Sequence, residues 1–82
     1  MTLTELRYIV AVAQERHFGR AAQRCFVSQP TLSIAIKKPE EALSVSLFDR
    51  SSTELINTDA GERIVAHASL VQDEADHLSH LA

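Results

Sequence analysis

Arg20-Ala21-Ala22, then the short turn Phe26-Val27, then Ser28-Gln29-Pro30-Thr31-Leu32-Ser33 make up the stretch that decides the fold of this chain. Two adjacent alanines allow one helix to approach another closely, and the β-branched Val27 can fill the angle between the helices. The segment after the turn opens with short polar side chains, which suit base edges and phosphates better than a protein core. The pattern therefore predicts a helix-turn-helix.

The helix after the turn has a clear start and two different sides. Pro30 lacks an amide hydrogen and fits a first turn, while either Ser28 or Gln29 can be the N-cap. Leu32 and Ile36 have the i, i+4 spacing of a buried stripe. On the other side, Gln can pair with adenine, Ser and Thr can meet bases or phosphates, and Lys can neutralise phosphate. These outward residues are Gln29, Thr31, Ser33, Lys37 and Lys38. An ordinary solvated face is the alternative.

Two helices are predicted before the turn. Thr2 and Glu5 stand at capping-box spacing, so a first helix is expected to begin there and to end near residues 16–17. Gly19 is tolerated at an N-cap, which places a short second helix over residues 20–25.

The pattern changes after the third helix. Two short extended runs, residues 45–48 and 55–56, flank a polar tip that contains Arg50. This arrangement predicts a small β-hairpin, the wing of a winged helix. Its tip can bring Arg50 and neighbouring hydroxyl groups against phosphates or into a minor groove.

Charge is distributed unevenly along the 82 residues. The net charge is -3, but residues 1–38 carry +4 and residues 39–82 carry -7. The basic part is expected to meet a polyanion, with a solvated mixed surface as the alternative. A hydrophobic content of 45% favours a folded, mainly helical chain over a disordered one.

Several function classes are not expected. There is no nucleophile motif, no glycine-rich phosphate loop and no evident carboxylate pair, so neither an enzyme nor a cofactor is predicted. His77 and His80, with two nearby aspartates, could hold a metal by spacing, but a solvated face is the preferred interpretation. The single Cys25 is expected to pack rather than to react. With no membrane span and no signal peptide in the sequence, a cytoplasmic protein is expected.

The last segment reads as one long helix that Thr58 caps and that runs to Ala82. Its roughly 36 Å exceed what a core this small needs to cover. Dimerisation through this helix is therefore predicted, with packing inside the monomer as the alternative. Domain bounds of 1–58 for the winged helix-turn-helix and 59–82 for a linker and dimerisation helix follow. The apolar residues recur as a heptad seam at Ile64, Ala68, Val71, Ala75, Leu78 and Ala82.

These motifs in combination resemble the amino-terminal DNA-binding domain of LysR-type transcriptional regulators, over nearly the whole chain. The wording from His17 to Ser33 is most similar to the OxyR branch, the peroxide-responsive regulators. The segments that carry the resemblance are Leu6 to Ala13, His17 to Ala22, Val27 to Ser33, Ile36, Glu40, Leu43, Leu47 to Arg50, Thr58 and Ala60-Gly61.

The resemblance implies sequence-specific binding of double-stranded DNA by a dimer on an interrupted inverted repeat. A protein-interaction or dimerisation module that does not bind DNA is the alternative function. LysR-type regulators normally continue into an effector-binding domain, which this chain is expected to lack. The residues that the resemblance implies contact DNA are Arg20, Ser28, Gln29, Pro30, Thr31, Ser33, Arg50 and Thr53. Lys37 and Lys38, expected from their charge to neutralise phosphates, complete the set of predicted DNA-binding residues.

Three positions depart from the family pattern. Pro39 stands inside the third helix where the family usually has leucine, at a cost on the order of 3 kcal/mol. A kink or an early end at Lys38 is therefore expected. Ala42 and Ser44 replace the usual acidic residue and glycine, so the turn into the wing loses its favoured left-handed residue.

Overall fold

Four helices and one small hairpin make up the fold, seen in a computed structural model that describes residues 1–51 and 54–81. The mainly α winged helix-turn-helix predicted from the sequence is confirmed. Thr53 and Ala82, named above as a wing contact and as the end of the seam, lie outside the described residues. The elements are α1 (Leu3–Glu15), α2 (Phe18–Cys25), α3 (Gln29–Leu43), β1 (Phe48–Asp49), β2 (Ile56–Asn57) and α4 (Asp59–Leu81).

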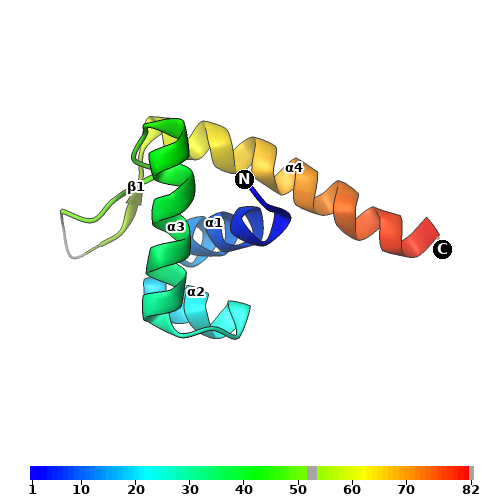
Figure 1. Ribbon diagram of the computed structural model, residues 1–82, viewed down its shortest axis with the longest axis horizontal. Coiled ribbons are helices and arrows are strands. Elements are labelled where there is room, and N and C mark those ends of the chain that lie inside the picture. The colour runs from blue at the N-terminus through cyan, green and yellow to red at the C-terminus, as the bar shows by residue number, and fades with distance from the viewer. Residues whose placement is uncertain (52–53, 82) are drawn as a thin grey trace.

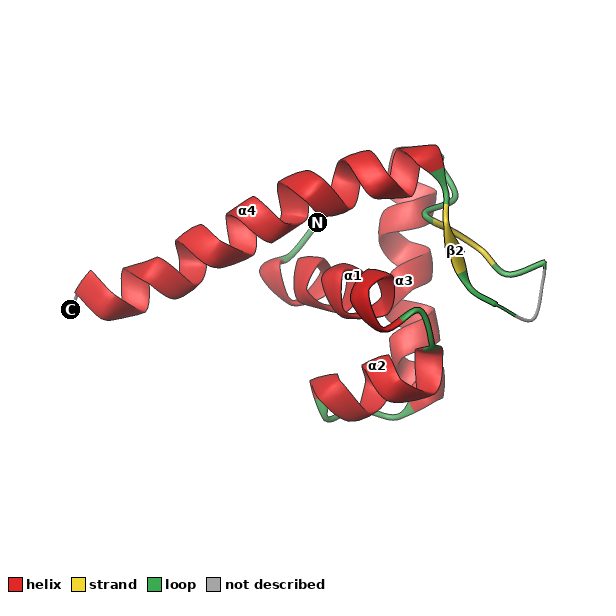
Figure 2. Cartoon of the chain, turned by 180° about the vertical axis from the view of Figure 1, so that it is seen from behind, coloured by secondary structure: helices red, strands yellow, loops and turns green. Residues whose placement is uncertain are grey.

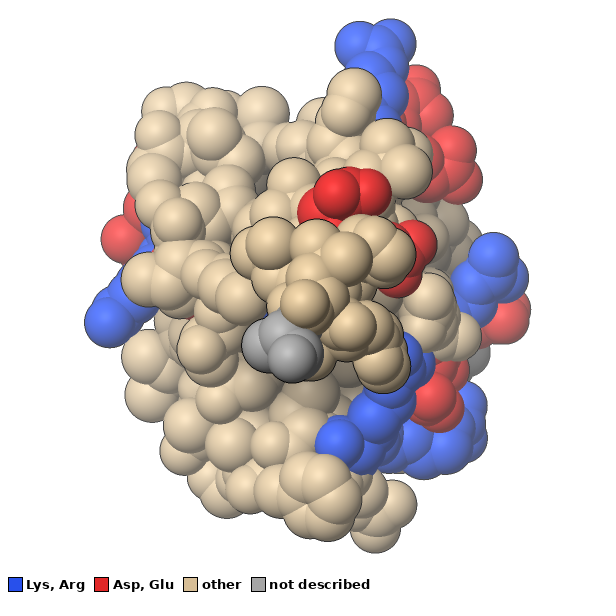
Figure 3. All heavy atoms as spheres, turned by 90° about the vertical axis from the view of Figure 1, so that its right-hand side faces the viewer, with Lys and Arg blue, Asp and Glu red and all other residues tan. Residues whose placement is uncertain are grey.

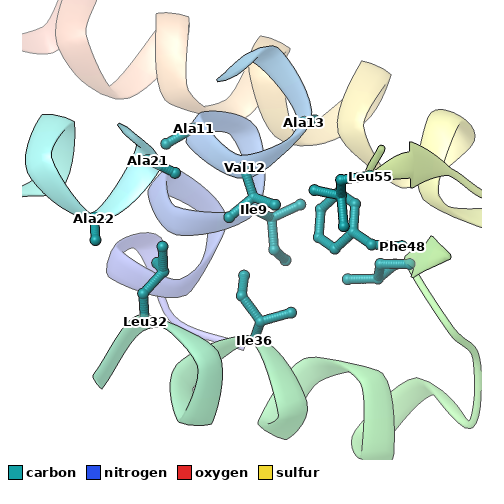
Figure 4. Packing of buried hydrophobic residues seen from close by; sticks show 11 residues of the cluster. Ile9, Ala11, Val12, Ala13, Ala21, Ala22, Leu32, Ile36, Phe48 and Leu55 are labelled. Carbon is teal, nitrogen blue, oxygen red and sulfur yellow. The ribbon is translucent and has the colours of Figure 1, made fainter. Parts of the chain in front are cut away.

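The first three helices pack around one apolar core, and α4 lies along α1 before it extends away from the rest of the chain (Figures 1 and 2). The core joins α1, α3 and the wing (Figure 4); its fully buried members include Ile9, Val12, Leu32, Ile36 and Leu47. Within the described ranges, none of the helices is both long and apolar enough to cross a membrane.

The starts of α1 and α2 are set by different caps. The Thr2 hydroxyl accepts a bond from the Glu5 amide at 3.1 Å, and the Thr2 amide donates to the Glu5 carboxylate at 2.7 Å, so the predicted capping box is confirmed. The bond from the Thr2 backbone lowers the pKa of Glu5. The predicted start of the second helix at Gly19 is wrong, because α2 begins at Phe18. His17 is the cap, and its Nδ1 accepts a bond from the Arg20 amide at 3.1 Å.

At the start of α3, Ser28 is the N-cap, and its hydroxyl accepts a bond from the Thr31 amide at 3.3 Å. The predicted early end at Lys38 is wrong, since the helix continues through Pro39 to Leu43. Pro39 is buried. The next residue, Glu40, holds the turn after the helix through both its backbone and its side chain. The carbonyl of this residue accepts a bond from the Val45 amide at 3.1 Å, and its carboxylate accepts one from the Leu47 amide at 2.7 Å.

The turn after α3 uses a serine where a left-handed backbone is needed. Ser44 has φ 55° and ψ 37° and forms the C-cap, with its amide donating to the carbonyls of Glu40 and Glu41. A side chain with a Cβ is disfavoured in this region, whereas glycine enters it freely. The left-handed turn is therefore made by Ser44 in place of the favoured glycine, at a cost in conformational free energy.

Replacing Ser44 with glycine is expected to stabilise the chain by about 1 kcal/mol, because the left-handed cost disappears. In thermal unfolding this corresponds to a rise of about 5 °C in the melting temperature. Ser44→Ala is the matched control, since alanine loses the hydroxyl but keeps the Cβ. An equal gain from both substitutions would contradict the backbone explanation.

The wing is a short antiparallel ladder in which Phe48 pairs with Asn57 and Asp49 pairs with Ile56. The predicted hairpin is confirmed, but its first strand starts later than expected. Residue 45 belongs to the turn instead, because its amide closes the end of α3. At the tip, hydrogen bonds from Ser51 lower the pKa of the Asp49 carboxyl.

The wing is also tied to the start of α4. The Leu47 carbonyl accepts a bond from the Thr58 amide at 3.1 Å, and the Thr58 hydroxyl donates to the Ser46 carbonyl. That hydroxyl in turn accepts a bond from the Gly61 amide at 2.9 Å. Farther along α4, Asp76 forms an ion pair of 2.8 Å with Arg7 of α1.

Candidate nucleic-acid interface

The outward side of α3 presents the polar residues that the sequence singled out. Ser28, Gln29, Pro30 and Thr31 are exposed at its start, and Ser33 is half-buried. The Ser28 hydroxyl donates to the Thr31 hydroxyl at 2.8 Å, so the cap also positions a neighbouring polar group. On later turns, Lys37 and Lys38 are exposed as well. One helix thus carries hydrogen-bonding groups at its start and two cations farther along.

Arg50 reaches this side of α3 from the wing. Its guanidinium lies 4.3 Å from the centroid of the Phe18 ring and 3.9 Å from the Glu40 carboxylate. Phe18 in turn meets Phe48 edge to face, with ring centroids 6.5 Å apart. A cation over an aromatic face is attracted by the ring electrons. Arg50 is therefore held between α2, α3 and the wing while its side chain remains partly exposed.

Two surface grooves show which predicted residues come together. A groove of about 540 Å³ between α3 and the wing is lined by Lys37, Glu40 and Arg50, among others. A smaller one of about 240 Å³ is lined by Gln29 and Arg50, together with His17 at the start of α2. Because Arg50 lines both grooves, α3 and the wing form one continuous face.

Arg20 lies at the edge of this region, on α2. Its Nη2 donates to the Glu15 carbonyl at 3.1 Å, and its Nε lies 3.8 Å from the Glu15 carboxylate. Arg24 pairs with the same carboxylate at 3.5 Å. Both guanidiniums stay exposed, so Arg20 can still reach a phosphate, although part of its charge is already balanced within the chain.

Sequence reasoning missed two exposed apolar residues near this face. Ile34 on α3 is 61% exposed, and Phe26 in the turn before α3 is 94% exposed. Ile34 could have been found from spacing, because it lies midway between Leu32 and Ile36, which face the core. Phe26 has a left-handed backbone at φ 59° as the C-cap of α2, a conformation that no sequence rule predicted for this residue.

The seam predicted on α4 divides between two environments. Ala68 is only 2% exposed and is covered by the chain itself, while Ile64 and Ala75 are half-buried. Val71 and Leu78 are exposed. Figure 3, which looks toward the free end of α4, shows a broad uncharged surface with acidic and basic groups in small clusters around it. Part of the seam therefore serves the monomer, and part of it is open.

Beside the open part lies an apolar groove of about 320 Å³. It is lined by the first residue of the chain and by residues of α1, α3 and α4, which are Met1, Leu6, Leu43, Arg63, Ile64, His67, Ala68 and Val71. Elsewhere, burial raises the pKa of the Cys25 thiol above its ordinary value, which disfavours the reactive thiolate. Across the described ranges, no three His, Cys, Asp or Glu side chains gather as a metal site.

A family model described as "Bacterial regulatory helix-turn-helix protein, lysR family" matches residues 3–62, which include α1, α2, α3 and the wing. The chain belongs to the lysR family. Its resemblance to the OxyR branch is also confirmed. Over all of its residues this lysR-family chain is 45% identical to the Escherichia coli K12 protein "DNA-binding transcriptional dual regulator OxyR". It is 40% identical, again over 100% of its length, to the "Hydrogen peroxide-inducible genes activator" of Haemophilus influenzae.

The chain spans 27% of the length of each of these two relatives. Among solved structures, full-length OxyR from Pseudomonas aeruginosa matches with a TM-score of 0.93 and 57% identity, over 99% of this chain and 28% of that one. The BenM DBD in complex with benA site 1 DNA matches with a TM-score of 0.94 and 33% identity, over 99% and 91%. The lysR-family fold is thus shared along the whole chain.

Proposed function

We propose that this chain binds double-stranded DNA in a sequence-specific manner, as the DNA-binding part of an OxyR-like transcriptional regulator. The observation that carries the proposal is the continuous face of α3 and the wing, where Gln29 and Arg50 line one groove and Lys37 and Arg50 line another. The family supports it, as do two similar structures that are themselves DNA complexes, of the BenM DBD and the CbnR DBD. No catalytic role is proposed.

The residues divide into two groups by chemistry. Gln29, Thr31 and Ser33 are proposed to discriminate between base pairs, because side-chain amides and hydroxyls can match the donor and acceptor pattern of the major groove. The cations are proposed to neutralise phosphates and so to make binding salt-dependent. The cationic group is Arg20, Lys37, Lys38 and Arg50; Ser28 and Pro30 would lie near the backbone, and Thr53 would add a wing contact.

We further propose that two copies pair through α4, so that residues 1–58 form a DNA-binding head and residues 59–82 a linker. Val71 and Leu78 are exposed apolar side chains on this helix, and Val71 also lines the apolar groove beside α1. Burying such residues against a second helix is favourable. A pair of heads would favour an interrupted inverted repeat. The cytoplasm, where bacterial DNA is reached directly, is the proposed location.

The function is tested by fluorescence anisotropy against two labelled duplexes across a salt series. One carries an inverted repeat recovered by binding selection from random DNA, and the other is its scrambled sequence. We expect tight binding to the first duplex. The logarithm of its association constant should fall linearly with the logarithm of the salt concentration, with a slope of about -0.9 for each phosphate neutralised. Equal and negligible binding to both duplexes would instead favour a protein-interaction module.

Replacing Gln29 with alanine is expected to weaken binding to the selected duplex about tenfold, because a bidentate contact to a base is lost. Discrimination against the scrambled duplex should fall by a similar factor. Gln14→Ala is the matched control, since Gln14 is an exposed glutamine of α1 outside the face. Equal losses from both variants would exclude Gln29 as a base contact.

Replacing Leu78 with aspartate is expected to raise the dissociation constant of the dimer at least about tenfold, since a charge would replace an apolar side chain that the proposed pairing buries. Sedimentation equilibrium measures this shift. Ser79→Asp adds the same charge one residue farther along the exposed end of α4. The pairing model is wrong if the two variants dissociate alike.

A further inference from the structure

Ile34 is an aliphatic side chain at the centre of the outward side of α3. Leu32 and Ile36, two residues to either side, are both fully buried in the core. At about 100° of rotation per residue, a side chain midway between them points away from the core. Ile34 is accordingly 61% exposed, although it lies in a helix that otherwise presents polar and charged groups outward.

The surroundings of Ile34 suit a polyanion with an apolar feature rather than an apolar protein surface. Lys37 and Lys38 follow at i+3 and i+4, so both lie one turn beyond the isoleucine toward the end of α3, and both are exposed. Thr31 and Lys38 also line a shallow groove of about 320 Å³ with Ile34, between α3 and the start of α1. An apolar group is thus flanked by two cations and a hydroxyl on α3, while the Glu5 carboxylate lines the far side of the groove, at the start of α1.

We infer that Ile34 reads the C5-methyl group of a thymine in the major groove. The inference rests on the proposed function, because it requires α3 to enter that groove. Among the edges that base pairs present there, the thymine methyl is the apolar feature, and aliphatic side chains recognise it by contact. The two flanking lysines would hold neighbouring phosphates while the isoleucine covers the methyl. The chain would then prefer thymine at one position of each half-site through a residue that makes no hydrogen bond to it.

The test removes only the methyl group from the DNA. In the duplex recovered by binding selection, each thymine is replaced in turn by deoxyuridine, and the affinity of the wild-type chain is measured by fluorescence anisotropy. One position per half-site is expected to lose about fivefold in affinity, as for one apolar contact of methyl size. The remaining positions should change little.

Ile34→Ala completes a double-mutant cycle with that substitution. On the thymine duplex the variant should lose about the same factor as the uracil substitution, and on the uracil duplex it should lose almost nothing more. Ile56→Ala is the matched control, because Ile56 is an exposed isoleucine of the wing. It should not couple to the same thymine. Circular dichroism of both variants verifies that the fold is intact.

Two results would overturn the inference alone. One is a wild-type chain that binds its selected duplex with no thymine sensitive to loss of the methyl. The other is independent, additive losses from Ile34→Ala and from the uracil substitution. A wild-type chain that binds no duplex at all would instead overturn the proposed function, and the inference with it.

Discussion

Replacing Gly61 with alanine is expected to destabilise the fold by about 3 kcal/mol, the larger of the effects expected at the two glycines of this chain. A Cβ built at Gly61 would lie 2.0 Å from the Leu47 carbonyl oxygen and 2.9 Å from its carbon. Both atoms belong to the backbone, and that same oxygen accepts a hydrogen bond from the Thr58 amide. The wing and α4 would have to separate to make room. Urea or thermal unfolding measures the loss.

Gly19→Ala is the matched control for Gly61→Ala. Its Cβ would lie 2.9 Å from the imidazole Cε1 of His17, which is a side chain and not backbone and can shift at the cost of weakening its cap bond with the Arg20 amide. Alanine also has a higher helix propensity than glycine by up to about 1 kcal/mol, which offsets part of the contact. The two variants should therefore differ by about 2 kcal/mol or more. Similar stabilities would show that the wing and α4 can part at little cost.

Replacing Pro39 with leucine is expected to stabilise the chain by about 2 kcal/mol and to raise its melting temperature by roughly 10 °C. Leucine restores an amide that can donate to the Ala35 carbonyl and removes the crowding of the proline ring against it. Because α3 already extends through Pro39 to Leu43, the gain should appear in thermal stability more than in helix content. Circular dichroism during heating measures both quantities.

Pro39→Ala separates the backbone contribution from packing. It restores the same hydrogen bond but leaves unfilled space at a buried position, so its gain should be smaller than that of leucine. If leucine lowers the melting temperature while alanine raises it, the pocket around residue 39 is too tight for the larger side chain. If neither variant gains, the proline costs this helix nothing.

Local patterns in the sequence predicted the helix starts whose partners lie a few residues apart. Thr2 and Glu5 bond each other across one turn, so spacing alone predicted that cap. For the third helix the sequence left Ser28 and Gln29 open, and the structure shows Ser28 as the cap. His17 was missed as a cap because rules for N-caps favour hydroxyl, carboxylate, amide and glycine residues. Its imidazole nitrogen does the same work as an acceptor.

The features that were not predicted depend on distant contacts. The helix survives Pro39 because its next residue, Glu40, holds the turn beyond through Val45 and Leu47. Ala68 repeats at heptad spacing whether its cover is α1 or a second chain, so the sequence pattern cannot tell the two apart. Likewise, the position of Arg50 over Phe18 joins the wing to α2, and neither segment alone predicts the pair.

The bonds at the root of α4 determine where this molecule can bend. Leu47, Thr58 and Gly61 join the wing to the first turn of the helix, and the ion pair between Arg7 and Asp76 ties the helix to α1 much farther along. A hinge at the boundary between residues 58 and 59 would have to break the bond from the Gly61 amide to the Thr58 hydroxyl and the ion pair between Arg7 and Asp76. Together with the burial of Ala68 against the rest of the chain, these contacts hold α4 to the residues before it, so the helix and residues 1–58 are expected to move together rather than to bend at residue 58.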